Sequence, residues 1–372
     1  MYSTEKNTEK RNECARTRGG SPSPHNTTPR LKTLVLGGNG LLGSNVIAEL
    51  TRRGHEVCAL VRPGVSWPDR GTWRVQLMEG NALSEADLCR ALSGCEAVVN
   101  CIGTTNPALR HYESYLPANR NLCRTLIAAM DRCGVRTLVH VSTANTIGCG
   151  QPSCPATETV PPAEPFASSL YARSKAEGEQ LILEAARRRP EGHIVVVNPG
   201  YIVGPYDSRP TSGRMILAAY RRRLMAMPDG GKSFVHAQAA ATAIVNALTM
   251  GRNGQRYLLT GPNLSLREFY TIVARTEGYR QRTLVLPNPL VKAAGRVGDA
   301  MRRLGISTSL STNNVQQLMA HEYYDSTLAQ TELQLPMLPV ADAVSSFVGW
   351  WAAHHPSHRF THRPQPKNHI TS

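Results

Sequence analysis

A glycine-rich turn between an apolar strand and a helix constrains this chain more than any other stretch of its sequence. Residues 34–36 are apolar, glycines follow at positions 37, 40 and 43, and residues 44–53 have helical spacing. Glycines at this spacing permit a tight turn, a close backbone approach to a diphosphate and close packing of helix on sheet. Strand, turn and helix together predict a dinucleotide-binding cradle, whereas a purely structural turn is the alternative.

Length and composition indicate a globular protein with more than one lobe. The 372 residues are enough for a nucleotide-binding domain and a smaller second part. No window approaches the roughly 18 to 20 apolar residues of a membrane span, and the N-terminus lacks a secretory signal. The nine cysteines are odd in number and form no Cys-x-x-Cys pair. We therefore expect a soluble, cytoplasmic protein with buried reduced thiols, no metal site and no integral membrane segment.

The formal charge of +15 raises the question of a nucleic-acid partner. Residues 1–30 and 356–372 each contribute +3, which leaves +9 on the rest. Arginine runs at 187–189 and 221–223 are expected at a helix end and on a helix, respectively. Cations favour helix C-termini, so we interpret the first run as a solvated terminus rather than a phosphate-binding patch. Because no aromatic residues interleave with these runs, we expect no nucleic-acid partner.

The alternation of strand and helix patterns predicts an α/β fold, a Rossmann-type doubly wound parallel sheet with a smaller C-terminal substrate-binding lobe. Further strands are expected at 56–61, 74–79, 97–102, 137–141 and 193–197. Later helices are expected at 215–225, 239–250, 265–278, 289–304 and 339–353, the last packed onto the domain by Trp350 and Trp351. The expected parts are a disordered tail (1–29), the dinucleotide domain (30–205), mainly the lobe with some elements returning to that domain (206–355), and a flexible tail (356–372). Three histidines in this last tail resemble a metal-binding tract only weakly.

The residues after the strands predict which cofactor is bound. Arg62 follows the second strand, where an arginine accommodates a ribose 2′-phosphate and a carboxylate would read a 2′-hydroxyl. This favours NADP(H) over NAD(H), although Arg62 could also be a surface residue of the turn. Asn81 follows the third strand and either contacts adenine or caps its own loop. The fourth strand leads to Gly103, where a small residue lets the cofactor pass.

Hydroxyl groups and a tyrosine-lysine pair predict the reacting end of the site. Ser142 and Thr143 follow the fifth strand, and a loop at 148–166 precedes a helix that begins near residue 170. Tyr171 and Lys175 are four residues apart and therefore lie on one helix face. A phenol has a pKa of about 10, which makes it a poor acid at neutral pH. A neighbouring ammonium lowers this pKa and brings proton transfer within reach. The alternative is a chance pairing on an exposed helix face.

These motifs together resemble the extended short-chain dehydrogenase/reductase superfamily, also called the NAD-dependent epimerase/dehydratase family. Within it, the chain is similar to the dihydroflavonol reductase-like branch over residues 31–354. The motifs that carry the resemblance are 37–43, 55–64, Tyr171 with Lys175, 198–199, 203–207, 209–213, 234–236, 254–257 and 324–326.

The resemblance implies roles for individual residues. Tyr171 would be the proton donor and acceptor, Lys175 would bind the nicotinamide ribose and lower the tyrosine pKa, and Thr143 would hold the substrate oxygen. Ser142 is the second choice for Thr143, and Asn119 has a supporting role. The implied cofactor-binding set is Gly37, Asn39, Gly40, Leu41, Leu42, Gly43, Arg62, Asn81, Ala82, Ile102, Gly103, Tyr171, Lys175, Pro199 and Ile202.

The chain also departs from the family at three places. Asn81-Ala82 stand where the family has Asp-Leu, and Ala237-Gln238-Ala239 stand where it has an aspartate pair. The first departure affects adenine recognition. The second lies near the substrate lobe and weakens any inference of this chain's substrate from the substrates of the family. Ala144-Asn145 replace the acidic residues that dehydratases carry after the Ser/Thr, which argues against nucleotide-sugar dehydration.

The expected function is an NADP-dependent oxidoreductase that transfers a hydride between nicotinamide and a carbonyl or secondary alcohol of a small substrate. Tyr171 would be its general acid and base. A sugar or nucleotide-sugar epimerase could use the same site, and a non-catalytic NADP-binding sensor or scaffold is a third alternative. The sequence names neither the substrate nor the oligomeric state, and a homodimer is compatible with it.

Overall fold

The computed structural model describes residues 30–356, except 66, 68, 70, 107, 108, 307 and 309. The expected N-terminal tail, Cys14 and the C-terminal tail from residue 357, with its histidines, lie outside the described residues. The chain from Leu31 onward belongs to one compact unit. The lobe and the dinucleotide-binding part are therefore described together.

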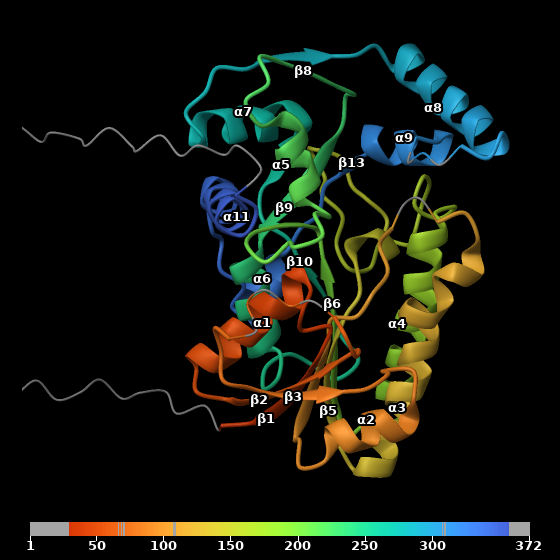
Figure 1. The fold of residues 1–372 in the computed structure, drawn as a ribbon. Helices are drawn as coiled ribbons and strands as arrows, with labels where there is room; N and C mark the ends of the chain where they lie inside the picture. Colours follow the sequence, from red (N-terminus) through yellow and green to blue (C-terminus); the bar gives the residue numbers. More distant parts are fainter. Residues whose placement is uncertain are drawn as a thin grey trace, which may run out of the picture. The chain divides into compact units, whose positions relative to one another are not determined.

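A seven-stranded parallel sheet confirms the predicted Rossmann-type fold (Figure 1). Its order is β3-β2-β1-β4-β5-β6-β10. The strands are β1 (Lys32–Leu36), β2 (Glu56–Val61), β3 (Val75–Glu79), β4 (Ala97–Asn100), β5 (Thr137–Val141), β6 (His193–Pro199) and β10 (Arg256–Leu259). The order reverses between β1 and β4, and ligands of such sheets bind beyond the carboxyl ends of the strands at this point.

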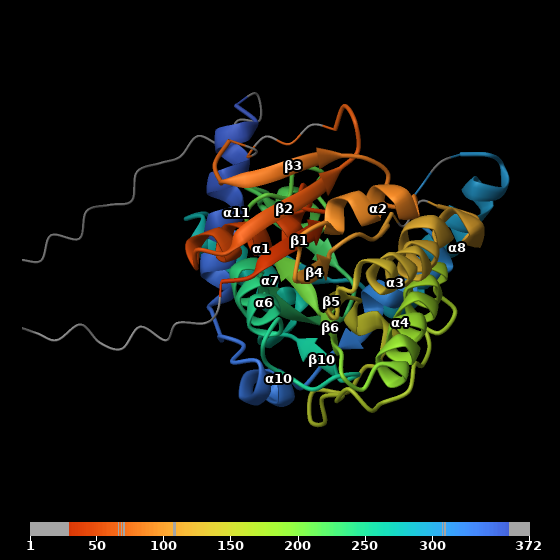
Figure 2. The ribbon, with the colours of Figure 1, turned by 90° about the horizontal axis from the view of Figure 1, so that it is seen from below.

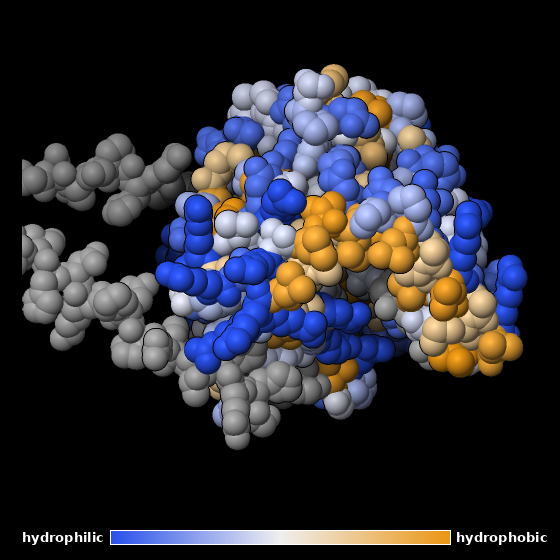
Figure 3. Space-filling view, turned by 90° about the horizontal axis from the view of Figure 1, so that it is seen from above, coloured by the Kyte–Doolittle hydropathy of each residue, from blue (hydrophilic) through white to orange (hydrophobic). Residues whose placement is uncertain are grey.

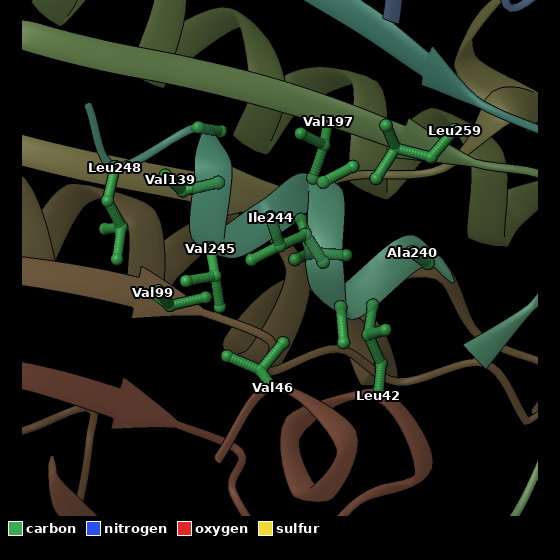
Figure 4. Close-up of a cluster of buried hydrophobic side chains, with 14 of the residues drawn as sticks. Leu42, Val46, Val99, Val139, Val197, Ala240, Ile244, Val245, Leu248 and Leu259 are labelled. Atoms are coloured by element: carbon green, nitrogen blue, oxygen red, sulfur yellow. The ribbon is translucent and has the colours of Figure 1, made fainter. Parts of the chain in front are cut away.

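Helices cover both faces of this sheet (Figure 2). One face is covered by α1 (Leu41–Arg52) and α6 (Ala237–Asn246), and the other by α2 (Glu85–Leu92), α3 (Leu122–Cys133) and α4 (Leu170–Arg188). Val46 of α1 and Ile244 of α6 meet the strand valines Val99, Val139 and Val197 in a fully buried cluster (Figure 4). Strands buried on both faces must be apolar along their length, which explains the continuous apolar runs in the sequence.

The lobe is built around β9 (Gly231–His236), which pairs with β7 (Tyr201–Val203), β11 (Asn263–Ser265) and β13 (His321–Glu322). A separate two-stranded sheet joins β8 (Leu224–Met227) to β12 (Arg282–Val285). The other elements are α5 (Gly213–Ala219), α7 (Leu266–Thr276), α8 (Asn288–Arg303), α9 (Thr312–Met319), α10 (Thr327–Glu332) and α11 (Val340–His354). Phe234 and Phe269 stack at 4.2 Å in the lobe core, where Trp350 and Trp351 of α11 are also buried. The packing role predicted for these two tryptophans is confirmed.

Three local expectations are wrong. The helix expected at 215–225 ends at Ala219, and the arginine run 221–223 lies in a turn, with Arg221 at φ 56°, before β8. The pairing of β8 with β12 takes this segment out of the helix, so a long-range contact overrides the local pattern. The strand expected at 97–102 ends at Asn100. The eight described cysteines are free as expected, but Cys133 and Cys154 are exposed rather than buried.

Candidate active site

The glycine turn has the geometry that a dinucleotide cradle requires. Gly37 has a φ of 78°, and a Cβ there would lie 3.0 Å from the backbone of Cys101 and Ile102. A Cβ on Gly43 would lie 2.1 Å from the carbonyl oxygen of Gly37, so the helix could not pack this closely with any other residue. At Gly40 a Cβ would meet only that same oxygen, at 3.4 Å. The backbone of the turn is thus open at Gly40, next to the N-terminus of α1, and fits a diphosphate.

The other residues of the expected cofactor-binding set differ in how far their side chains are buried. Asn39 and Leu41 are half-buried at the turn, whereas the side chain of Leu42 is buried in the core between α1 and the sheet. Ile102 and Ala82 each pack against the core on the opposite face of the sheet. Pro199 is buried at the end of β6, and Ile202 lies in β7. Leu42 can therefore offer a ligand only its backbone.

The end of the site assigned to adenosine lies at β2 and β3. Arg62 is exposed and directly follows β2. The side-chain oxygen of Asn81 accepts a hydrogen bond from the amide of Leu83 at 3.0 Å. Of the two roles left open for Asn81, the structure contains the loop cap.

Thr143 and Tyr171 meet at the carboxyl end of β5. Thr143 follows that strand, and its side chain also accepts a hydrogen bond from the amide of Asn145 at 3.3 Å. Tyr171 lies in the first turn of α4, which Ser169 caps. Burial raises the pKa of Tyr171 to about 12, while the nearby side chain of Thr143 acts to lower it. The buried hydroxyl of Ser142 has no hydrogen-bond partner among the described residues, and of the two residues only Thr143 affects the pKa of Tyr171.

Lys175 lies one turn after Tyr171, but its ammonium faces the sheet. Its Nζ donates to the carbonyl of Val141 at 2.9 Å and to that of Ile102 at 3.4 Å. Burial lowers the pKa of Lys175. Burial and Tyr115 raise the pKa of Tyr171, Thr143 acts to lower it, and Lys175 is not among these causes, so the lowering of the tyrosine pKa by Lys175 stays a prediction. Gly103 makes room for the lysine, since a Cβ there would lie 2.9 Å from its Cε and Nζ.

Asn119 connects the two sides of this arrangement. It lies in a π-helical turn (Pro117–Asn121) that leads into α3. Its side-chain nitrogen donates to Ser174 Oγ at 2.8 Å and to the carbonyl of Thr104 at 3.1 Å, and its oxygen accepts from the amide of Thr104 at 2.8 Å. The residue therefore ties the segment after β4 to the helix that carries the tyrosine and lysine. This contact agrees with the supporting role expected for Asn119.

A buried polar network behind Thr143 was missed by sequence reasoning. Asn198 donates to the carbonyl of Thr143 at 3.2 Å and to Glu179 at 2.8 Å. Glu179 also accepts from Thr146 at 2.8 Å and pairs with Arg256 of β10 at 3.3 Å. The motifs at 198–199 and 254–257 contain Asn198 and Arg256, but no motif contains Glu179, which joins the two residues across segments far apart in the chain.

Two more features near Tyr171 were also missed. The ring of Tyr115 lies 6.5 Å from that of Tyr171, and Tyr115 is buried. A cavity of about 370 Å³ is lined by Leu170, Leu109, Arg110, Asp299, Arg302 and Arg303. A cavity of about 470 Å³ lies elsewhere, beside Lys32, Glu56 and Val75 at the amino ends of the first three strands, away from the tyrosine. Nothing in the sequence could place α8 next to residue 170.

Comparison with known proteins defines the class. Residues 33–259 match the NAD dependent epimerase/dehydratase family. This chain therefore belongs to that family and is an NAD(P)-dependent oxidoreductase. Both the extended short-chain dehydrogenase/reductase resemblance and its dihydroflavonol reductase-like branch are confirmed.

Individual relatives cover most of the chain. A putative dihydroflavonol 4-reductase of Synechocystis sp. is 26% identical over 86% of this chain and 94% of its own length. A 4-hydroxy-2-methyl-3-oxo-4-farnesyl-3,4-dihydroquinoline-1-oxide ketoreductase of Stigmatella aurantiaca is 30% identical over 73% of this chain and 81% of its own. The crystal structure of gox2253 superimposes with a TM-score of 0.75 at 27% identity, over 87% of this chain and 98% of that one. Among the described residues, no helix is long and apolar enough to span a bilayer.

Proposed function

We propose that this protein is an NADP-dependent reductase of a carbonyl group, with Tyr171 as the general acid and base. The observation that supports this most is the proximity of Thr143, at the end of β5, to Tyr171, whose pKa the threonine side chain acts to lower. The pair lies where β5 ends, and Lys175 bridges the ends of β4 and β5 beside it. The relatives from Synechocystis and Stigmatella are named as a putative dihydroflavonol 4-reductase and a ketoreductase, which supports reduction as the direction of the reaction.

The roles of the residues follow from their positions. The bound cofactor supplies or accepts the hydride. Tyr171, with a pKa raised to about 12, holds its proton at neutral pH and can donate it to the oxygen that forms during reduction. Thr143 orients the phenol and the substrate oxygen. Lys175 is held by two carbonyls next to Gly103, from where it can bind a ribose hydroxyl.

The choice of NADP over NAD rests on Arg62. Its exposed guanidinium follows β2, where the ribose of a dinucleotide bound in a Rossmann fold lies. A 2′-phosphate would find a cation there. The homodimer and the cytoplasmic location remain predictions.

The test offers the purified protein NADPH and a panel of ketones and aldehydes. The oxidation of NADPH is measured by the fall in its absorbance. The Tyr171→Phe variant should bind NADPH as the wild type does but turn over about 100 to 10,000 times more slowly, because it lacks the proton donor. Tyr279→Phe, which removes a phenol in the lobe, is the matched control and should keep full activity. An unchanged rate in Tyr171→Phe would refute the assignment.

The same experiment separates the alternatives. An epimerase would convert a nucleotide sugar with tightly held cofactor and without net loss of NADPH absorbance. A protein that binds NADPH but turns over neither ketones nor sugars would be a sensor, an alternative that the reductase names of the relatives do not support.

A further inference from the structure

The positive charge of this protein is concentrated at the lobe. Residues 208–228 and 278–321 together carry eleven basic side chains and one acidic side chain, which accounts for +10 of the formal +15. The two segments meet in space because β8 pairs with β12 in parallel, and α8 follows β12 directly. We call the surface formed by β8, β12 and α8 the lobe-end surface.

Large apolar side chains are exposed on this same surface. In the described part of the chain, ten large apolar side chains are exposed, and five of them, Leu224, Leu284, Leu290, Val297 and Leu304, lie on β8, β12 or α8 or directly after α8. Leu224 of β8 is 56% exposed, Leu290 and Val297 of α8 are each 58% exposed, and Leu304 is 79% exposed. Single exposed apolar residues are ordinary, but a group of this kind on one surface marks an interaction site.

The helix α8 separates three kinds of side chain onto three faces. Val291, Gly295 and Gly298 face the protein, and a Cβ on Gly298 would lie 2.3 Å from the carbonyl of Leu310. Leu290, Val297 and Leu304 are seven residues apart, nearly two helical turns, and form an apolar line. The exposed cations Lys292, Arg296 and Arg303 form a second line on the outward side. In Figure 3, apolar and charged side chains lie together on the face of the molecule that includes this end.

An apolar line flanked by cations is the arrangement of a helix that lies in a membrane interface. The apolar side chains enter the boundary between head groups and acyl chains, and the cations stay at the anionic head groups. A nucleic-acid surface would use the cations for phosphates but would give no reason to expose Leu304. The single acid of α8, Asp299, is occupied by Thr312, which donates to it from its amide and hydroxyl.

We propose that the lobe-end surface docks this protein onto the surface of an anionic phospholipid bilayer. Docking of this kind is peripheral and requires no membrane-spanning helix. The proposal concerns attachment and does not depend on the reaction that the protein catalyses.

The position of the surface also bears on how substrate arrives. Arg302 and Arg303, at the end of α8, line the cavity of about 370 Å³ that includes Leu170, the residue before Tyr171. The docked face therefore adjoins a recess lined by Leu170, the neighbour in sequence of the predicted catalytic tyrosine. If the proposed reductase function holds, a substrate dissolved in the bilayer could enter without crossing bulk water.

The test is flotation of the full chain with vesicles of phosphatidylcholine alone or mixed with phosphatidylglycerol. We expect flotation with the mixed vesicles, loss of binding at high salt, and little flotation with phosphatidylcholine alone. Lys292→Gln combined with Arg296→Gln should weaken binding about 30-fold, since each cation at an anionic surface contributes about 5-fold. Val297→Asp combined with Leu304→Asp should weaken binding at least as much. Each substitution removes an apolar side chain that would be buried in the bilayer interface, and the loss lowers the affinity about 10-fold or more.

Matched controls keep the test independent of folding and activity. Arg187→Gln with Arg188→Gln removes the same charge from the end of α4, and Met337→Asp places an acid at another exposed apolar side chain. Both controls should float like the wild type, and all variants should bind NADPH equally.

Three results would overturn the proposal. Wild type that does not float with the mixed vesicles excludes docking. Binding of duplex DNA that depends on Lys292 and Arg296 but not on Leu304, without flotation, identifies a nucleic-acid surface. A dimer that Leu304→Asp converts to monomer, again without flotation, shows that a second copy covers the apolar line.

Discussion

The contact between α4 and the turn before α3 allows a sharp test of how the site is held. Gly178 of α4 lies against Asn119, and a Cβ at this glycine would lie 2.0 Å from the Asn119 carbonyl oxygen. Ordinary contact begins near 3.4 Å, so in Gly178→Ala the two segments must part by about 1.4 Å. Because the opposing atom belongs to the backbone, no change of rotamer can relieve the clash.

The expected cost follows from these contacts. Overpacking of this kind costs about 1 to 3 kcal/mol, and loss of the hydrogen bond from Asn119 to Ser174 adds about 1 kcal/mol. Alanine recovers up to about 1 kcal/mol through its higher helix propensity. We expect Gly178→Ala to lower the free energy of unfolding by about 1 to 3 kcal/mol. It should also lower kcat, by up to about 100-fold, because the helix that carries Tyr171 and Lys175 must shift by about 1 Å.

Chemical denaturation measures the first quantity, and the NADPH assay measures the second. Gly349→Ala is the matched control, because this glycine also lies in a helix but a Cβ there meets nothing within 4 Å. Its stability should be unchanged or slightly raised. If Gly178→Ala is as stable and as active as Gly349→Ala, close packing at Asn119 does not hold the site, and the reasoning is refuted.

Two further predictions concern the cofactor and pH. Arg62→Ala should weaken NADPH binding and leave NADH binding unchanged, because only NADPH carries the 2′-phosphate; fluorescence titration measures both, and equal losses would contradict the assignment. Alcohol oxidation needs the phenolate of Tyr171, whose pKa is raised to about 12, so its rate should rise about tenfold per pH unit through the neutral range. Ketone reduction uses the protonated phenol and should stay nearly flat. A plateau of oxidation near pH 7 would show that the pKa in the working complex is much lower.

Features encoded by short stretches of sequence could be predicted. The spacing of the glycines predicted the geometry of the turn, since Gly37 has a positive φ and Gly43 packs against it. The strand order follows from alternating strands and helices with right-handed crossovers, so the fold class could also be inferred. Tyr171 and Lys175 share a helix face because helix periodicity places them there.

Features that depend on distant segments could not be predicted. Helix spacing placed Lys175 near Tyr171 but not the direction of its ammonium, which depends on the carbonyls of Val141 and Ile102 at two strand ends. The arginine run at 221–223 was assigned to a helix because no feature of the neighbouring sequence indicates the pairing of β8 with β12. In each case, the deciding contact joins residues more than 30 positions apart.

The network behind Thr143 shows why the dinucleotide-binding part and the lobe cannot be treated as independent. Arg256 lies on β10, which follows several elements of the lobe in the chain, and pairs with the buried Glu179. It also donates to the backbone carbonyl of Glu158, whose carboxylate accepts the amide of Leu258 at 2.9 Å. The loop at 148–166 is thereby tied to β10, and β10 to Thr143 through Glu179 and Asn198. A chain that ended at residue 205 would leave the carboxylate of Glu179 buried without its arginine, which is strongly destabilising. The boundary expected at residue 205 stays a prediction about which part binds cofactor and which binds substrate, and the polar contacts that support Thr143 require both parts of the chain.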